Sequence, residues 1–353
     1  MIASGRMLCP YGSHRVLEPL GALPQAAQRL DATPVAYDNE ILCDVEMLAI
    51  DSASFAQMRE ACDGDAARIA RTILSTVRER GKQHNPVTGS GGMFVGQVRE
   101  IGAALAGRID LRAGDRIASL VSLTLTPLRL EAIDGIDVAT ARARVRGTAI
   151  LFERSAWAKL RGDLDECVAL AVLDVAGAPA QVARLARPGQ SVVVIGADGK
   201  SGILACARAK EATGPGGSVI AVVPDERTSG ARLLRETRIV DDLIEADARD
   251  ALALQSRVTR TLPDGADLVV NCVNVAGTEA GSILCTKDGG TIYFFSMATS
   301  FTAAALGAEG LGKDVTMIVG NGYAPHHAEI ALDTVTANPA ILAYYVNHYG
   351  APA

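Results

Sequence analysis

The chain has 353 residues, enough for two domains, and 49% of them are hydrophobic, so there is ample material for a buried core. The net charge is −6, with acidic and basic residues mixed along the chain, so no basic stripe indicates a nucleic-acid partner. No apolar run is long enough to span a membrane, and residues 1–10 lack the apolar core of a secretory signal. We therefore expect neither a nucleic-acid nor a membrane partner.

Seven cysteines are scattered singly, and none forms a Cys-x-x-Cys pair: Cys9, Cys43, Cys62, Cys167, Cys206, Cys272 and Cys285. An odd, unpaired set in a long chain indicates a reducing compartment, in which small buried thiols are the ordinary interpretation. We therefore expect a cytoplasmic protein.

The first 160 residues show short runs of alternating apolar and polar residues that are broken by turns. This pattern predicts strands at residues 41–48, 93–98 and 116–121. A charged stretch at 61–81 has a helical pattern, and a second polar insertion spans about 128–147. We predict a small β-barrel for this half of the chain.

Beyond residue 160 the pattern alternates between strands and helices. Strands are predicted at 191–195, 219–223, 242–246, 267–273, 291–295 and 315–319, and helices at 201–211, 229–237, 248–261 and 278–285. Helical patterns from about His327 close the chain. The alternation favours a parallel, doubly wound sheet of the Rossmann type.

Three glycines follow the strand at 191–195 at three-residue spacing: Gly196, Gly199 and Gly202. The first permits a tight turn, the second allows backbone N–H groups to approach a pyrophosphate, and the third allows close packing of helix and strand. A glycine-rich turn without a ligand is the alternative, but the flanking strand and helix favour dinucleotide binding.

Further residues are predicted to contact the cofactor because they lie in this turn or at the ends of later strands, where ligands bind in such sheets: Asp198, Lys200, Ser201, Asn271 and Ser296. The acidic residue expected at the end of the second strand is replaced by Val223. Asp225 and Glu226 follow slightly late, and Arg227 is within reach of a 2′-phosphate. The sequence therefore leaves NAD and NADP open.

Residues 40–45, 96–102 and 113–117 resemble the medium-chain dehydrogenase/reductase superfamily, which joins a GroES-like barrel to a Rossmann domain. Its zinc members place a cysteine after the first strand and Gly-His-Glu before the second. Here these positions hold Asp51 and the loop that contains Ser90. Catalytic zinc needs three protein ligands, and the spacing of His84, His326 and His327 supports no such site. We predict an enzyme without a metal.

Longer and less common strings carry a more specific resemblance: residues 11–19, 50–55, 85–93, 173–181, 195–202, 271–274, 293–301, 305–310 and 320–323. Over essentially its whole length the chain resembles the L-erythro-3,5-diaminohexanoate dehydrogenase family. The expected catalytic domain is then 1–165 with 325–353, and the dinucleotide domain is 166–324. We also expect a homodimer. Asp198 departs from the apolar residue usual in such turns.

The resemblance implies oxidative deamination of a diamino acid substrate. The 3-amino group is oxidised to an imine, and water releases ammonia and 5-amino-3-oxohexanoate. A neutral amine has a lone pair that can expel hydride, so the missing zinc fits an amine substrate. Because an amine arrives protonated, a base must first remove its proton.

Four residues are candidates for this chemistry. Asp51 is the first candidate for the base or for stabilising an iminium, with a turn cap as its alternative. Arg15 could clamp the substrate carboxylate and His14 could act as a base, although ordinary surface charges are the alternative for both. Ser90 could donate a hydrogen bond to the substrate.

Two other functions remain open at this stage. One is a zinc-free quinone or enoyl reductase, which would need an apolar substrate pocket instead of the charged set of Asp51, His14 and Arg15. The other is a catalytically silent NADPH-binding protein, for which cofactor binding without turnover of diamines would be diagnostic.

Overall fold

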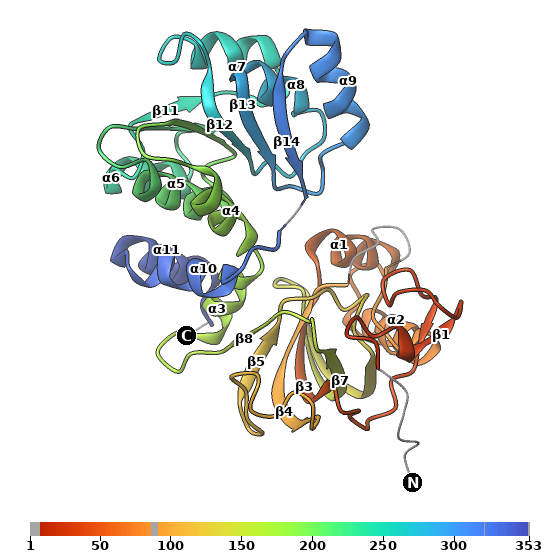
Figure 1. Cartoon of the computed structure of the whole chain (residues 1–353). Helices are drawn as coiled ribbons and strands as arrows, with labels where there is room; N and C mark the ends of the chain where they lie inside the picture. Colours follow the sequence, from red (N-terminus) through yellow and green to blue (C-terminus); the bar gives the residue numbers. More distant parts are fainter. Residues whose placement is uncertain (1–7, 86–90, 321, 352–353) are drawn as a thin grey trace. The chain divides into compact units, whose positions relative to one another are not determined.

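The computed structural model describes residues 8–85, 91–320 and 322–351 (Figure 1). The chain folds into two compact units, residues 1–161 and residues 162–353. Each has its own sheet and its own hydrophobic core.

The first unit is built on a six-stranded antiparallel sheet with the strand order β6-β7-β3-β4-β5-β8. Its strands are β3 (Glu40–Ala49), β4 (Met93–Ile101), β5 (Arg116–Ser119), β6 (Leu128–Asp137), β7 (Arg142–Phe152) and β8 (Trp157–Lys159). Side chains from five of these strands meet in one core, among them Val45, Phe94, Ile117, Leu128 and Leu151. The strands expected near residues 45, 95 and 118 are confirmed.

The rest of the first unit precedes this sheet or lies between its strands. A 3-10 helix (Ser13–Arg15) leads into the two-stranded sheet of β1 (Val16–Glu18) and β2 (Arg29–Leu30). Helices α1 (Ser52–Ala61) and α2 (Ala66–Arg80) separate β3 from β4. Helix α2 accounts for the expected helical stretch: Ile69, Ile73 and Val77 recur every four residues on its buried side.

The interpretation of residues 128–147 as a polar insertion is wrong, because this segment belongs to the β6–β7 hairpin. The two strands pair antiparallel from Leu128 with Ala149 to Asp137 with Arg142. Most of β6 is exposed or half-buried, so its many charged side chains are compatible with a strand. The many charged residues made the hairpin look like an insertion in the sequence, because the buried positions of the hairpin lie mainly on β7.

The second unit is a parallel sheet with the strand order β11-β10-β9-β12-β13-β14, which confirms the expected Rossmann type. Its strands are β9 (Ser191–Ile195), β10 (Ser218–Val223), β11 (Asp242–Glu245), β12 (Ala266–Asn271), β13 (Thr286–Phe294) and β14 (Val315–Val319). Helices α5 (Lys200–Thr213) and α6 (Ser229–Thr237) cover one face, and α7 (Ala251–Val258), α8 (Glu279–Leu284) and α9 (Phe301–Leu311) cover the other (Figure 1).

The last two helices pack within this second unit, whereas residues 325–353 were expected to join the first. Helix α10 (His327–Thr336) contacts α5 as well as α3 (Glu166–Leu173) and α4 (Gly177–Leu185). Helix α11 (Pro339–Tyr349) contacts α3 and α6, and the buried Tyr345 donates a hydrogen bond to the Lys200 carbonyl at 2.6 Å. Among the described residues no single helix is long and apolar enough to cross a membrane, and α3 with α4, bent by 50°, passes only as a pair and by length and composition alone.

Candidate active site

The glycine turn between β9 and α5 has the backbone geometry of a phosphate-binding turn. Gly196 has φ 77°, in the left-handed region that favours glycine. A Cβ on Gly202 would lie 2.2 Å from the Gly196 carbonyl oxygen, so helix and strand pack too closely there for any side chain. A Cβ on Gly199 would meet nothing closer than that oxygen, at 3.6 Å. The protein itself therefore leaves room at Gly199, which is where a pyrophosphate would approach the backbone.

The N-terminus of α5 is open to an anion. Its N-cap, Gly199, makes no side-chain hydrogen bond to the first turn, whereas side chains cap the N-termini of α2, α3, α6, α7, α9 and α11. The first amides of an α-helix have no carbonyl partner within the helix, and they lie at the positive end of its dipole. Uncapped amides beside a glycine turn fit a phosphate group.

A cavity of about 640 Å³ opens beside this turn, at the carboxyl ends of the central strands. The order of the strands reverses between β9 and β12, which is the place where open α/β sheets bind ligands. Four groups of residues line the cavity: Gly196, Asp198 and Gly199 of the turn, Val223 and Pro224 at the end of β10, Asp247 and Arg249 after β11, and Val273 and Asn274 after β12.

Several of these residues were not predicted from the sequence. Asp247, Arg249 and Asn274 each follow the carboxyl end of a parallel strand within two to four residues. That position is the signal that could have identified them, because the strands themselves were predicted. Arg249 and Asp247 form a two-bond ion pair, with Nε donating to Oδ1 at 3.0 Å and a terminal nitrogen donating to Oδ2 at 2.7 Å.

Three predicted cofactor residues have partners inside the protein. The Lys200 ammonium forms an ion pair with Asp174. The Arg227 guanidinium binds both oxygens of Asp225 at 2.9 and 2.8 Å, and this bonding lowers the pKa of Asp225 to about 2. Ser201 is buried at the start of α5 and hydrogen bonds with the Cys272 thiol.

Two other predicted cofactor residues, Asn271 and Ser296, hold parts of the cavity wall in place. Asn271 is fully buried, and its amide donates to Thr278 and to Ser282, both at 2.9 Å, which ties β12 to α8. The Ser296 hydroxyl donates to Asn274 Oδ1 at 3.4 Å, and Asn274 lines the cavity. Asn271 therefore anchors the strand, and Ser296 positions a residue of the wall.

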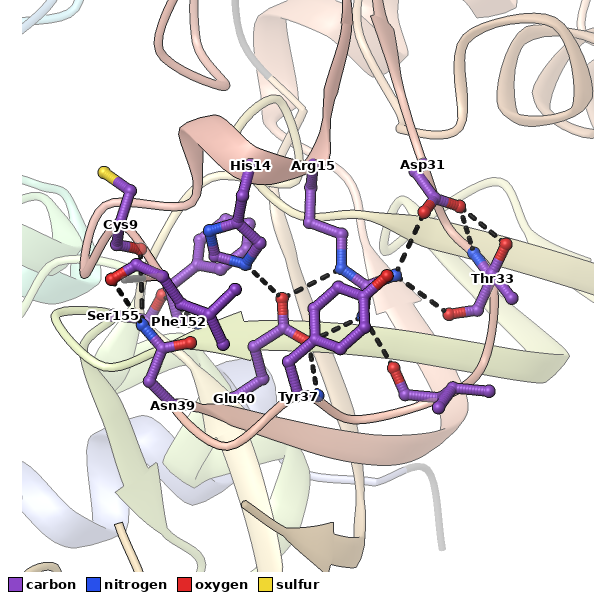
Figure 2. A network of polar contacts seen from close by, with 12 residues as sticks. Cys9, His14, Arg15, Asp31, Thr33, Tyr37, Asn39, Glu40, Phe152 and Ser155 are labelled. Atoms are coloured by element: carbon purple, nitrogen blue, oxygen red, sulfur yellow. Dashed lines mark hydrogen bonds and ion pairs between the residues drawn. The ribbon is translucent and has the colours of Figure 1, made fainter. Parts of the chain in front are cut away.

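In the first unit, Arg15 is a structural residue, so its prediction as a substrate clamp is wrong (Figure 2). Its side chain is 1% exposed. Nε and a terminal nitrogen bind the two oxygens of Glu40 at 2.9 and 2.6 Å. Its other bonds go to the Asp31 carboxylate and to the carbonyls of Thr33 and Val35. A guanidinium whose donors are all engaged cannot also bind a substrate carboxylate.

Glu40 is the centre of this buried cluster. It also accepts a hydrogen bond from His14 Nε2 at 2.8 Å and one from the Tyr37 amide at 2.9 Å. Burial alone would raise the pKa of Glu40, but the hydrogen bonds from Arg15, His14 and Tyr37 together bring it below its usual value. His14 is thus a partner of Glu40 in the core and not an ordinary surface charge.

Asp51 lies directly before α1, and its Oδ1 accepts the Ser54 amide at 3.2 Å. This is the helix-capping interaction that the sequence left as the alternative to catalysis. The Asn85 amide donates to the Ser54 carbonyl at 3.4 Å and to Gln57 Oε1 at 2.6 Å, so Asn85 is tied to α1. Ser90 lies outside the described residues. Within the described ranges no three His, Cys, Asp or Glu side chains are grouped to hold a metal ion.

Comparison with known proteins decides the family. Residues 14–161 match the model of the L-erythro-3,5-diaminohexanoate dehydrogenase N-terminal domain. The L-erythro-3,5-diaminohexanoate dehydrogenase of Acetoanaerobium sticklandii is 51% identical over 97% of this chain and 99% of its own length. The enzyme of the same name from Fusobacterium nucleatum is 49% identical over 92% and 94%. The chain belongs to the L-erythro-3,5-diaminohexanoate dehydrogenase family.

Solved structures of an oxidoreductase and a reductase share the fold of this family member. A mycobacterial quinone oxidoreductase aligns with a TM-score of 0.54 at 16% identity, covering 92% of each chain. The CurK enoyl reductase aligns with a TM-score of 0.53 at 14% identity, covering 89% of this chain and 80% of its own. At such identities the likeness concerns the fold alone, and it confirms the predicted fold class.

The family match also agrees with the division of the chain. The matched N-terminal domain ends at residue 161, where the first unit ends. It begins at His14, so the whole Arg15–Glu40 cluster belongs to the diaminohexanoate dehydrogenase domain. We infer that this cluster is part of the architecture of the domain.

Proposed function

We propose that this protein catalyses the oxidative deamination of L-erythro-3,5-diaminohexanoate to 5-amino-3-oxohexanoate and ammonia, with a nicotinamide cofactor as oxidant. The observation that carries the proposal is the identity of about half of all residues, over nearly full length, with two enzymes of that name. The glycine turn and its cavity support the cofactor independently of those names.

The second unit would hold the cofactor. The uncapped amides at the start of α5 would bind its pyrophosphate, and Gly199 would allow the approach. When bound, the nicotinamide supplies the acceptor for hydride. The protein's part is to orient the dinucleotide along the carboxyl ends of β9, β10 and β12, whose following residues form the cavity wall.

Of the two cofactors we propose NAD. A 2′-phosphate is bound best where the charge of an arginine is not already neutralised by a carboxylate. Arg249 on the cavity wall and Arg227 after β10 are each paired through two hydrogen bonds to an aspartate. The wall also carries the carboxylates of Asp198 and Asp247, which would repel a phosphate. Calorimetric titration with NADH and NADPH tests this, and tighter binding of NADPH would contradict it.

In the first unit, we assign the proton transfer to Asp51. Its carboxylate lies at the N-terminus of α1, where Oδ1 accepts a hydrogen bond from the Ser54 amide. It would take the proton of the substrate ammonium, which frees the nitrogen lone pair. It would then face the positive charge that develops as the C=N bond forms.

The test is NADH formation by the purified protein with a panel of β-amino acids. We expect turnover with L-erythro-3,5-diaminohexanoate and much weaker turnover with 3-aminohexanoate, which lacks the second amine. Cofactor binding without turnover of any amine would favour the silent nucleotide-binding protein. Oxidation of NAD(P)H by quinones or enoyl substrates, in place of amine turnover, would favour the reductase.

A further inference from the structure

In the described part of the chain, three backbone amides at the start of α5 donate no hydrogen bond. They belong to Lys200, Ser201 and Gly202. The next amide, that of Ile203, donates to the Gly199 carbonyl at 3.0 Å and begins the helical pattern. The N–H bonds of an α-helix point toward its N-terminus, so the three amides face the space that Gly199 leaves open.

Two cations near this turn are already paired with carboxylates. The Lys200 ammonium forms an ion pair with Asp174 at the end of α3. On the cavity wall the Arg249 guanidinium is paired with Asp247, and Asp198 adds a further carboxylate. The favourable interactions of a bound pyrophosphate therefore have to come mainly from the backbone amides, and the strength of these amides as donors becomes important.

A buried hydroxyl donates to one peptide group of this first turn. Tyr345 lies in the middle of α11, and its hydroxyl donates to the Lys200 carbonyl at 2.6 Å. A helical carbonyl ordinarily accepts one bond, from the amide four residues ahead, so the Tyr345 bond is a second one to the same oxygen. Burial raises the pKa of Tyr345 well above its usual value, so the hydroxyl keeps its proton and remains a donor.

The carbonyl that Tyr345 contacts shares its peptide group with one of the three amides. This group joins Lys200 to Ser201, with the Lys200 carbonyl at one end and the Ser201 N–H at the other. Its C–N bond has partial double-bond character, so a donor at the oxygen draws electron density away from the nitrogen. Hydrogen bonds in series strengthen one another in this way. The Tyr345 hydroxyl therefore makes the Ser201 N–H a stronger donor.

We propose that Tyr345 is a positioning residue of the cofactor site: its hydroxyl fixes and polarises the peptide group between Lys200 and Ser201, whose N–H binds the pyrophosphate. This inference rests on the proposed nicotinamide cofactor. It gives α11 a part in cofactor binding, although the described lining of the cavity contains no residue of that helix. Helix α11 is itself held by its contacts with α3 and α6, so the hydroxyl is presented from a packed element.

The test uses Tyr345→Phe, which removes the hydroxyl and keeps the ring. The Lys200 carbonyl keeps its helical bond in this variant, so no buried group loses its only partner and the protein should fold. Tyr344→Phe, the same change one residue earlier on α11, is the matched control. The Tyr344 hydroxyl makes no hydrogen bond to the residues that the structure describes, so its removal should have no effect on the turn.

The readout is the calorimetric Kd for NADH, together with the Kd values for ADP and adenosine from competition against NADH. NADH and ADP contain the pyrophosphate, and adenosine lacks it. We expect Tyr345→Phe to bind NADH and ADP about fivefold more weakly and adenosine unchanged, and Tyr344→Phe to bind all three like the wild type. Equal losses for all three ligands would show that the hydroxyl serves only the packing of α11, and this result, or no loss for NADH, would overturn the inference. A wild-type protein that does not bind NADH would instead overturn the proposed cofactor.

Discussion

Replacing Gly199 with valine should remove cofactor binding and leave the fold intact. The backbone at this position has φ −82° and ψ 169°, an extended conformation that valine adopts readily. A Cβ there would meet only the Gly196 carbonyl oxygen, at 3.6 Å, which is an ordinary contact distance. The new side chain would instead occupy the space in which a pyrophosphate approaches the amides of α5.

The magnitudes separate this position from Gly202, three residues along. For Gly199→Val we expect a change in unfolding free energy within about 0.5 kcal/mol, as for an open surface site. For Gly202→Ala the added carbon would lie 2.2 Å from the Gly196 oxygen and 2.6 Å from Ala197 Cα. Such overpacking costs about 1–3 kcal/mol, and the better helix propensity of alanine offsets about 1 kcal/mol of it.

The assay combines thermal unfolding with calorimetric titration of NADH. Gly199→Val should keep the wild-type Tm and lose at least about 100-fold in affinity, or about 2.8 kcal/mol. Gly202→Ala should unfold at a lower temperature. Wild-type affinity in a folded Gly199→Val protein would refute the assignment of this turn to the pyrophosphate. A lower Tm for Gly199→Val would show that the position has a structural requirement of its own.

The remaining predictions concern the other site, the core and the metal. Asp51→Asn keeps the helix cap and removes the charge, so it should lower kcat by about 10²–10⁴-fold with little change in Tm or NADH affinity. Wild-type turnover in this variant would show that Asp51 is only a helix cap. Glu40→Gln removes the buried carboxylate from the Arg15 guanidinium and leaves it only the half-exposed Asp31, so it should cost about 3 kcal/mol in urea unfolding. Asp44→Asn, at a more exposed position of the same strand, is the control. Because hydrogen bonds lower the folded pKa of Glu40 below its reference value of 4.5, its contribution is complete above pH 4.5 and is lost as pH falls through the folded value. Wild-type protein should therefore lose more stability on acidification to pH 4 than Glu40→Gln does, and parallel losses would contradict this. Treatment with EDTA should leave turnover intact, and a loss of activity that zinc restores would refute the metal-free prediction.

The sequence by itself determined the features that depend on neighbouring residues. The strand, three glycines and helix of the phosphate turn are contiguous, so their spacing predicts their geometry. The inner strands β9, β10 and β12 of the second unit were recognisable because buried parallel strands are nearly continuous apolar runs. Long strings of uncommon residues identified the family, as the comparison with two relatives confirmed. The homodimer and the cytoplasmic location stay predictions.

Only the tertiary structure decided which charged and polar residues are buried. Arg15 looks like a surface charge or a substrate clamp until Asp31 and Glu40, 16 and 25 residues away, surround it. The same holds for Tyr345, whose hydroxyl reaches the Lys200 carbonyl, 145 residues away, only once the chain is folded. Local pattern cannot show this, because the cost of burying a charge or a hydroxyl depends on partners that distant parts of the chain provide.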